Sequence, residues 1–199
     1  MLDTTSATGL DRRPAIVICA WDDADSAWDL VEDLSGEPWN PNGARTIAVR
    51  ADEPTALAAR LGELVSDTST RAVLLVGRSR KTDGFVLQMR AENRGFHTGE
   101  RLDRVGPSMA RATAPVAEIV RALIDAGMVA EASSEAEDDA GSYLLYRVLA
   151  QLPESVDTPA VGLLRAPHDE GDESVRAAIK AAAQAMARHL SPLPRPRVA

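Results

Sequence analysis

The side chains of this sequence that could perform covalent chemistry are few: one thiol and three imidazoles in 199 residues. A thiol becomes a nucleophile when a neighbouring imidazole takes its proton and a third group orients that imidazole. Cys19, however, lies within an apolar run, which is typical of an inert buried thiol. The histidines are His97, His168 and His189. Each stands apart from the others in the chain, and a lone loop histidine is more often solvated than catalytic.

A second chemical feature is the cationic turn at residues 77–81, Gly-Arg-Ser-Arg-Lys, which follows a buried apolar run. Its cations, Arg78 among them, could clamp a carboxylate or another anion at the end of a strand. The alternative is a solvated basic turn. The sequence contains no Cys-x-x-Cys pair, no His-Glu-x-x-His motif and no Gly-rich phosphate loop. We therefore expect neither a metal site nor a cofactor.

The elements that would position these residues alternate between strands and helices. Short apolar runs with β-branched residues predict buried strands, and apolar residues three or four apart predict helices. The predicted strands are 14–20, 46–49, 71–77, 84–90, 128–132 and 159–165, and the predicted helices are 22–34, 53–65, 115–126, 141–152 and 172–190. This order predicts a three-layer α/β/α sandwich with a mixed, mostly parallel central sheet. The polar stretch 92–107 is expected to form a long loop or hairpin of the kind that is usually functional or mobile.

Size and composition favour one globular domain at 14–190 between flexible tails at 1–13 and 191–199. The formal net charge of −8 counts against a general nucleic-acid or anionic-membrane surface. No apolar run approaches the length of a membrane-spanning helix, and residues 1–13 lack the apolar core of a secretory signal. A single cysteine excludes an internal disulfide and fits a reducing compartment. We expect a soluble cytoplasmic protein that binds neither nucleic acid nor membrane.

Three blocks of the chain resemble the catalytic half of the pyroglutamyl peptidase I family, cysteine peptidases that remove an N-terminal pyroglutamate. Residues 77–93 match in length a block of that family which contains Gly-Gln-Ala-Gly-Gly-Arg and then Glu-Arg-Val-Ala-Ile-Asn. Residues 139–146, Asp-Ala-Gly-Ser-Tyr-Leu-Leu-Tyr, resemble Asp-Ala-Gly-Arg-Tyr-Leu-Cys-Asn. Residues 162–167, Gly-Leu-Leu-Arg-Ala-Pro, resemble Gly-Phe-Ile-His-Val-Pro. The resemblance extends over about residues 14–190 and implies the fold of that family.

The resemblance places a different residue at each of the family's three catalytic positions. Gln88 stands at the position of the glutamate, Leu145 at that of the nucleophilic cysteine and Arg165 at that of the histidine. A deletion of one turn after Tyr143 is an alternative alignment, and it removes the cysteine as well. Leucine cannot be a nucleophile, and a guanidinium cannot accept a proton near neutral pH. The resemblance therefore implies a pseudoenzyme with no catalytic residue retained.

The resemblance also implies a ligand cleft, because open α/β sheets place ligands at the carboxyl ends of their strands. The residues expected to line it are Gln88, Arg165, Arg78, Trp21 and Tyr143. Trp21 would supply an aromatic wall in place of the family's Gly-Phe-x-Pro-Phe-Gly loop. The arginines favour a small anionic ligand such as a carboxylate, and a peptide N-terminus is the other ligand class. Family members often self-associate, so we also expect a homo-oligomer.

Two functional hypotheses follow. The first is a catalytically inactive protein with a binding or assembly role in the retained cleft. The second is an active cysteine-type peptidase, or another hydrolase, with a relocated nucleophile at Cys19 or Ser142. His168 would be the candidate base for Cys19.

A geometric expectation accompanies the first hypothesis. Gln88, Leu145 or its helix neighbours, and Arg165 should lie in one cleft, because their blocks match the family's catalytic blocks in order. Gln88 and Arg165 should then be less than about 15 Å apart, the size of a small-ligand pocket.

Overall fold

The computed structural model describes residues 13–21, 41–152 and 157–190. Its centre is a six-stranded sheet with the strand order β2-β1-β3-β8-β4-β7. The strands are β1 (Ala15–Ala20), β2 (Arg45–Val49), β3 (Thr70–Ser79), β4 (Phe85–Gln88), β7 (Ala130–Ser133) and β8 (Ala160–Pro167). The first four in the sheet order are parallel, whereas β4 is antiparallel to β8 and parallel to β7. The predicted mixed, mostly parallel sheet is therefore confirmed.

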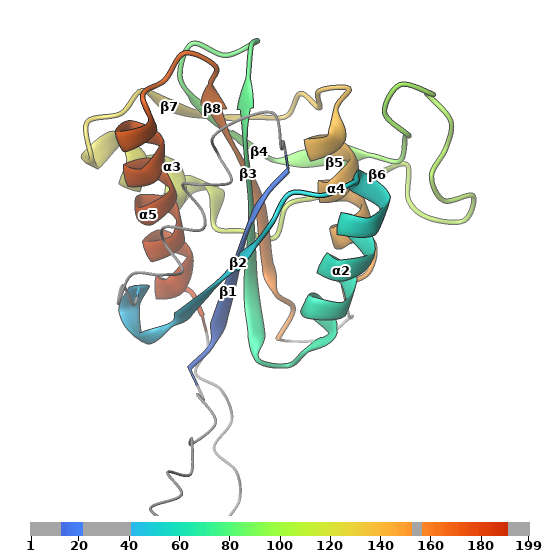
Figure 1. Ribbon diagram of the computed structural model, residues 1–199, viewed down its shortest axis with the longest axis horizontal. Helices are drawn as coiled ribbons and strands as arrows, with labels where there is room; N and C mark the ends of the chain where they lie inside the picture. The colour runs from blue at the N-terminus through green and yellow to red at the C-terminus, as the bar shows by residue number, and fades with distance from the viewer. Residues whose placement is uncertain (1–12, 22–40, 153–156, 191–199) are drawn as a thin grey trace, which may run out of the picture.

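Helices cover both faces of this sheet (Figure 1). Helices α2 (Pro54–Ser66) and α4 (Ala140–Leu149) pack together on one face, and α3 (Val116–Asp125) and α5 (Asp172–Arg188) pack together on the other. A short 3-10 turn, η1 (Pro41–Gly43), precedes β2. The three-layer sandwich predicted from the sequence is confirmed, while the predicted helix 22–34 and the tails 1–12 and 191–199 lie outside the described residues. Among the helices described, none has both the length and the apolarity needed to span a bilayer.

The two-residue alternation of the strands divides the interior into two cores. In β8, Gly162, Leu164 and Ala166 face α3 and α5, whereas Val161 and Leu163 face α2 and α4. Arg165 follows in this second series and is 1% exposed. The guanidinium of Arg165 is therefore buried between the sheet and α4.

The predicted strand 84–90 is wrong in one respect: it is two strands in two sheets. Strand β4 ends at Gln88, and β5 (Arg90–Glu92) pairs with β6 (Met109–Arg111) in a separate two-stranded antiparallel sheet. The division occurs at Met89, whose N–H donates to the Ser133 carbonyl of the large sheet and whose carbonyl accepts from the Ala112 N–H beyond β6. Ala91 is fully buried and anchors the small sheet, which packs against α4.

The stretch between β5 and β6 is held to the body of the protein by specific hydrogen bonds. The side chain of Asn93 donates to the Asp103 carbonyl at 2.7 Å and accepts from the Asp103 N–H at 2.9 Å. The Tyr146 hydroxyl, on α4, donates to the Pro107 carbonyl at 2.9 Å. The predicted loop or hairpin is thus a hairpin whose connection is fastened at both ends.

Candidate functional site

The centre of the candidate site is the buried guanidinium of Arg165 on β8. Its Nη1 and Nη2 atoms donate to the two carboxylate oxygens of Asp139 at 2.6 and 3.0 Å, which is a bidentate ion pair. Nε donates to Gln88 Oε1 at 3.0 Å, and Nη2 also donates to Ser142 Oγ at 3.1 Å. A second carboxylate oxygen, Oε1 of Glu137, lies 3.5 Å from Nε. The guanidinium is therefore surrounded by acceptors and charge-compensated in place.

The pairing of β4 with β8 explains why Gln88 and Arg165 meet. Gln88 lies opposite Leu163 in the antiparallel register, and Arg165 is two residues further along β8 on the same face. Diagonal cross-strand neighbours of this kind are within reach of long side chains. The distance of 3.0 Å is far inside the limit of about 15 Å expected for a small-ligand pocket.

Helix α4 supplies the other two partners through its first turn. Asp139 is the N-cap, and its Oδ1 accepts from the Ser142 N–H at 2.9 Å while both of its oxygens hold Arg165. Burial by itself would raise the pKa of Asp139, but the hydrogen bonds and charge of Arg165 and the Ser142 amide outweigh it. The pKa therefore ends below its ordinary value. Asp139 is thus ionised near neutral pH, as the ion pair requires.

The carboxylate of Asp139 is next to the hydroxyl of Ser142, but it is a poor base, because Arg165 lowers its pKa and holds it in a bidentate ion pair. Its Oγ accepts from Gln88 Nε2 and from Arg165 Nη2, each at 3.1 Å, and donates to Gln88 Oε1 at 3.3 Å. An amide and a guanidinium cannot act as a general base near neutral pH. Ser142 lies at the place where Gln88 and Arg165 converge, but its surroundings do not activate it as a nucleophile.

Leu145 lies one turn further along α4 and belongs to the core between α2, α4 and the sheet. It is fully buried. Tyr143, 8% exposed, lies in the same core and makes an edge contact with the ring of Phe96 at 5.3 Å between centroids. Tyr143 and Leu145, the two predicted site residues on α4, therefore pack as core side chains. Their helix neighbour Ser142 makes the polar contacts with Gln88 and Arg165.

The indole ring of Trp21 stacks over the buried guanidinium of Arg165. Cζ of Arg165 lies 5.4 Å from the centroid of its ring, within the range of a cation–π contact. The ring fits against two glycines: a Cβ added to Gly77 would be 2.0 Å from Trp21 Cε2, and one added to Gly141 would be 2.8 Å from the same atom. Any larger residue at either position would displace the indole. The structure thus brings Trp21 to Arg165.

Arg78 lies on the other face of the sheet. It pairs in register with Ala166, whereas Gly77 pairs with Arg165, so the two guanidiniums point to opposite layers. Arg78 donates to Asp172 Oδ1 at 2.7 Å and to carbonyls that precede α5. The structure therefore does not bring Arg78 to Gln88 and Arg165, and the expectation that all five cleft residues line one site is not met.

The groups proposed for a relocated nucleophile are also separated. Cys19 is fully buried, its Sγ donates to the Ala20 carbonyl at 3.3 Å, and burial raises the pKa of its thiol to about 12. His168 is exposed beside a pocket at the ends of β3 and β8. A protonated thiol within a strand cannot attack a substrate.

A pocket of about 440 Å³ adjoins the buried cluster. It is lined by Trp21, Asp52, Glu53, Pro54, Phe96, His97, Asp138, Asp139 and Ala140. Asp139 connects the two sites, because its carboxylate reaches Arg165 on one side and lines this pocket on the other. His97 adopts a left-handed backbone conformation with φ of 66°, and such strain in a non-glycine residue is concentrated at functional sites.

Sequence reasoning missed Asp139 and Glu137 as partners of Arg165. A signal was present: Arg165 is the one charged residue in the apolar segment 159–167, and an arginine in a buried strand requires a carboxylate. The N-cap position of Asp139 already explains a carboxylate there, because its side chain caps α4. The sequence therefore gives no separate indication that the same carboxylate pairs with Arg165. In the described part of the chain, no group of three or more His, Cys, Asp or Glu side chains is arranged to hold a metal.

Comparisons with known proteins bear on the fold. No family model matches this sequence, and no curated protein matches it either. Among solved structures, pyroglutamyl peptidase I from Bacillus amyloliquefaciens aligns with a TM-score of 0.79 over 89% of this chain and 96% of that chain, at 17% identity. The chain has the fold of pyroglutamyl peptidase I.

Two further structures agree with this assignment. A mutant pyrrolidone carboxyl peptidase from Pyrococcus furiosus aligns with a TM-score of 0.77 over 87% of this chain and 98% of that chain, at 14% identity. The pyrrolidone carboxyl peptidase from Thermus thermophilus aligns with a TM-score of 0.72 over 85% and 98%, at 20% identity. At these identities the likeness to pyroglutamyl peptidase I concerns the fold, and the chemistry must be argued from the side chains of this chain.

Proposed function

We propose that this protein is a non-catalytic binding protein built on the pyroglutamyl peptidase I fold. The observation that carries this proposal is the state of Arg165, which is buried, paired with Asp139 and hydrogen-bonded to Gln88 and Ser142. Cysteine-peptidase chemistry needs a thiolate, a base and an orienting acid close together. The described cluster contains a guanidinium, an amide, a hydroxyl and carboxylates, but no thiol and no imidazole.

The cluster is better suited to holding the structure around a pocket than to reacting with a ligand. Arg165 fixes the start of α4 through Asp139 and contacts the face of the Trp21 ring. Asp139 and Trp21 both line the pocket of about 440 Å³. A rigid support of this kind preorganises a binding site, which reduces the entropy lost when a ligand binds.

The side chains around this pocket favour an amine over an anion. Asp52, Glu53 and Asp138 line it besides Asp139, whose charge Arg165 compensates, and so do the aromatic rings of Trp21 and Phe96. The two arginines that suggested an anionic ligand are both engaged elsewhere, Arg165 with Asp139 and Arg78 with Asp172. Carboxylates and aromatic rings together stabilise an ammonium group. We therefore assign the pocket to a ligand with a free amino group, such as a peptide N-terminus.

The absence of catalysis is tested by incubating purified protein with a chromogenic pyroglutamyl amide, before and after thiol alkylation. We expect no turnover above the uncatalysed rate. Turnover that disappears in Cys19→Ala would establish a relocated thiol nucleophile, and turnover that disappears in Ser142→Ala would establish a serine one. Either result would overturn the proposal.

The ligand class is tested by calorimetric titration with a short peptide bearing a free amino terminus and with the same peptide acetylated. We expect only the free amine to bind, and Asp138→Asn to weaken it by about tenfold, the effect of one lost charge-assisted contact. Glu131→Gln is the matched control, because Glu131 is an exposed carboxylate on the edge strand β7 and does not line the pocket. Equal binding of both peptides would remove the amine assignment. Self-association stays a prediction that sedimentation would test.

A further inference from the structure

The outer face of the small sheet β5–β6 presents an unusual pair of like charges. Arg90 and Arg111 are directly opposite each other in the antiparallel register. Opposed like charges destabilise a strand pair, so this arrangement costs free energy unless something compensates it. In the described part of the chain, neither guanidinium has a hydrogen-bond or ion-pair partner, and Nε of Arg90 is buried without one. The ribbon thus holds two cations opposite each other with no ion-pair partner among the described residues.

A pocket with two more arginines adjoins this pair on the side of Arg90, while Arg111 is not among its lining residues. A pocket of about 480 Å³ is lined by Arg90, Glu92, Asn93, Arg94, Gly99, Arg101, Ser108 and Met109. Arg94 is 3.7 Å from Glu92, and both are exposed, so this pair is weak. Arg101 donates to the Gly106 carbonyl at 2.7 Å, which orients it without neutralising it. Glu92 is the one carboxylate that lines the pocket, against three guanidiniums.

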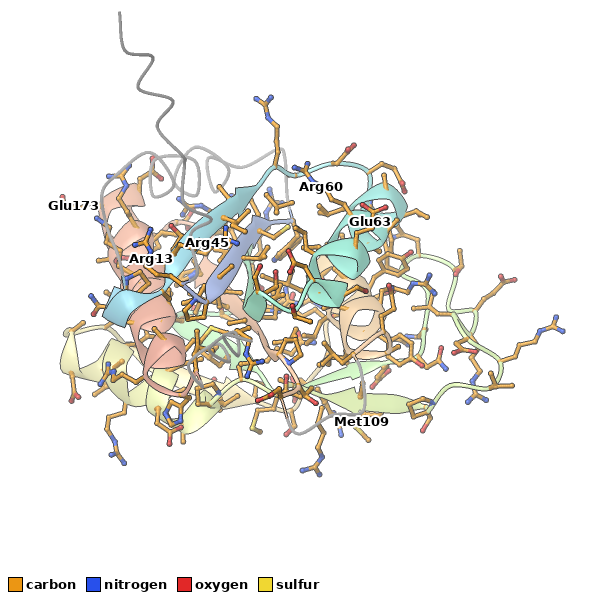
Figure 2. All side chains as sticks on the ribbon, turned by 90° about the horizontal axis from the view of Figure 1, so that it is seen from below. Arg13, Arg45, Arg60, Glu63, Met109 and Glu173 are labelled. Atoms are coloured by element: carbon orange, nitrogen blue, oxygen red, sulfur yellow. The ribbon has the colours of Figure 1, made fainter. Side chains whose placement is uncertain are left out.

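The fold explains why these residues face outward. Ala91 and Ala110 occupy the inner face of the ribbon and pack in the core on the α4 side, so Arg90, Glu92, Met109 and Arg111 occupy the outer face. Figure 1 shows the ribbon beside α4, and Figure 2 places Met109 at the edge of the molecule. The pocket is therefore open to solvent, and none of its lining side chains belongs to the Arg165 cluster.

We propose that this pocket, the ribbon pocket, binds the phosphoryl group of a small phosphorylated ligand. A guanidinium offers a planar fork of N–H donors that matches the oxygens of a phosphate, and three of them, on Arg90, Arg94 and Arg101, line this pocket. A dianion compensates the excess of cations, whereas a single carboxylate would compensate only one of them. The volume is that of a small-molecule site. On a chain with a formal net charge of −8, such a local excess of cations selects an anion at one place.

The test is calorimetric titration of the full-length protein with inorganic pyrophosphate at low ionic strength. We expect binding that weakens as salt is added, because the attraction is screened. Arg101→Gln should weaken binding at least about tenfold, since Arg101 lines the pocket and each charge-assisted contact to phosphate is worth about that factor or more. Arg60→Gln is the matched control: Arg60 is an exposed arginine on α2, and Figure 2 places it at the opposite edge of the molecule from Met109. The control should bind like the wild type.

A second variant keeps the test independent of any loss of folding. Arg90→Gln removes the opposed charge, so we expect its thermal stability without ligand to equal or exceed that of the wild type while its affinity for pyrophosphate falls at least about tenfold. If wild type, Arg101→Gln and Arg60→Gln bind pyrophosphate equally, or if the wild type does not bind it, the proposal is wrong and the arginines serve only to keep an exposed ribbon from pairing with other chains. If citrate binds as tightly as pyrophosphate, the assignment to phosphoryl groups is wrong.

Discussion

Replacing Asp139 by asparagine should destabilise the protein by about 3 kcal/mol, the lower end of the range for removing one partner of a buried ion pair. Asparagine is as good an N-cap as aspartate, so the bond from the Ser142 N–H is retained. What is lost is the negative charge and one of the two bonds that Asp139 accepts from Arg165. The cation is 1% exposed, and among the described residues Glu137, 3.5 Å from Nε, is its one remaining carboxylate.

The measurement is urea unfolding followed by far-ultraviolet circular dichroism at pH 7, where a loss of this size should lower the midpoint by about 1 M. Asp157→Asn is the matched control. Asp157 also pairs with an arginine, Arg71, at 2.7 Å, but its side chain is 55% exposed, and surface pairs contribute less than about 1 kcal/mol. If Asp139→Asn costs no more than Asp157→Asn, the ion pair does not hold Arg165 in the core. The double variant Asp139→Asn with Arg165→Met should be less destabilised than Asp139→Asn alone, since it leaves no buried cation.

The same variant has a pH signature. The pKa of Asp139 is lowered in the folded state, so its contribution to stability is fully present above the unfolded value of about 3.9 and is lost as the pH falls through the folded value. The stability difference between wild type and Asp139→Asn should be constant from neutral pH down to about 5 and should close below about 4. A difference that is unchanged at pH 3 would contradict this reasoning.

Three further outcomes follow from the packing. Cys19 should resist iodoacetamide in the native protein at pH 8 and react only on unfolding, because its thiol is buried with a pKa of about 12; mass spectrometry detects the adduct. Gly77→Ala should lower the free energy of unfolding by about 2 kcal/mol or more, because the added methyl group overpacks the core against Trp21. Adding Trp21→Leu to Gly77→Ala should restore part of that stability, measured as the midpoint of thermal unfolding. No restoration would mean that the two side chains do not meet. Tyr146→Phe should cost about 1 kcal/mol and speed hydrogen exchange near Pro107, because it removes the hydroxyl's bond to that carbonyl.

Much of the architecture follows from the sequence because it depends on local patterns. Apolar runs of the length of a strand, separated by helices of period 3.6, predict a covered α/β sheet, and the sheet and its helices have that arrangement. For residues 92–107 the sequence leaves a loop or a hairpin open, and it does not give the separate small sheet β5–β6, because the two strands are three residues long and are joined through a long connection. Strands of that length carry no periodic signal, and only Ala91 in the core and the backbone bonds of Met89 decide where they pair.

The meeting of Gln88 with Arg165 was expected from three blocks of sequence, whereas the partners of Arg165 and the place of Arg78 were decided by tertiary structure. Adjacent residues of a strand point to opposite faces, so the pairing of Gly77 with Arg165 and of Arg78 with Ala166 sends the two arginines into different layers. Nothing local to residues 77–81 reveals which layer each will enter. A buried cation then needs a carboxylate at hydrogen-bonding distance, and Asp139, 26 residues before Arg165, is brought there only because α4 packs on that face of the sheet.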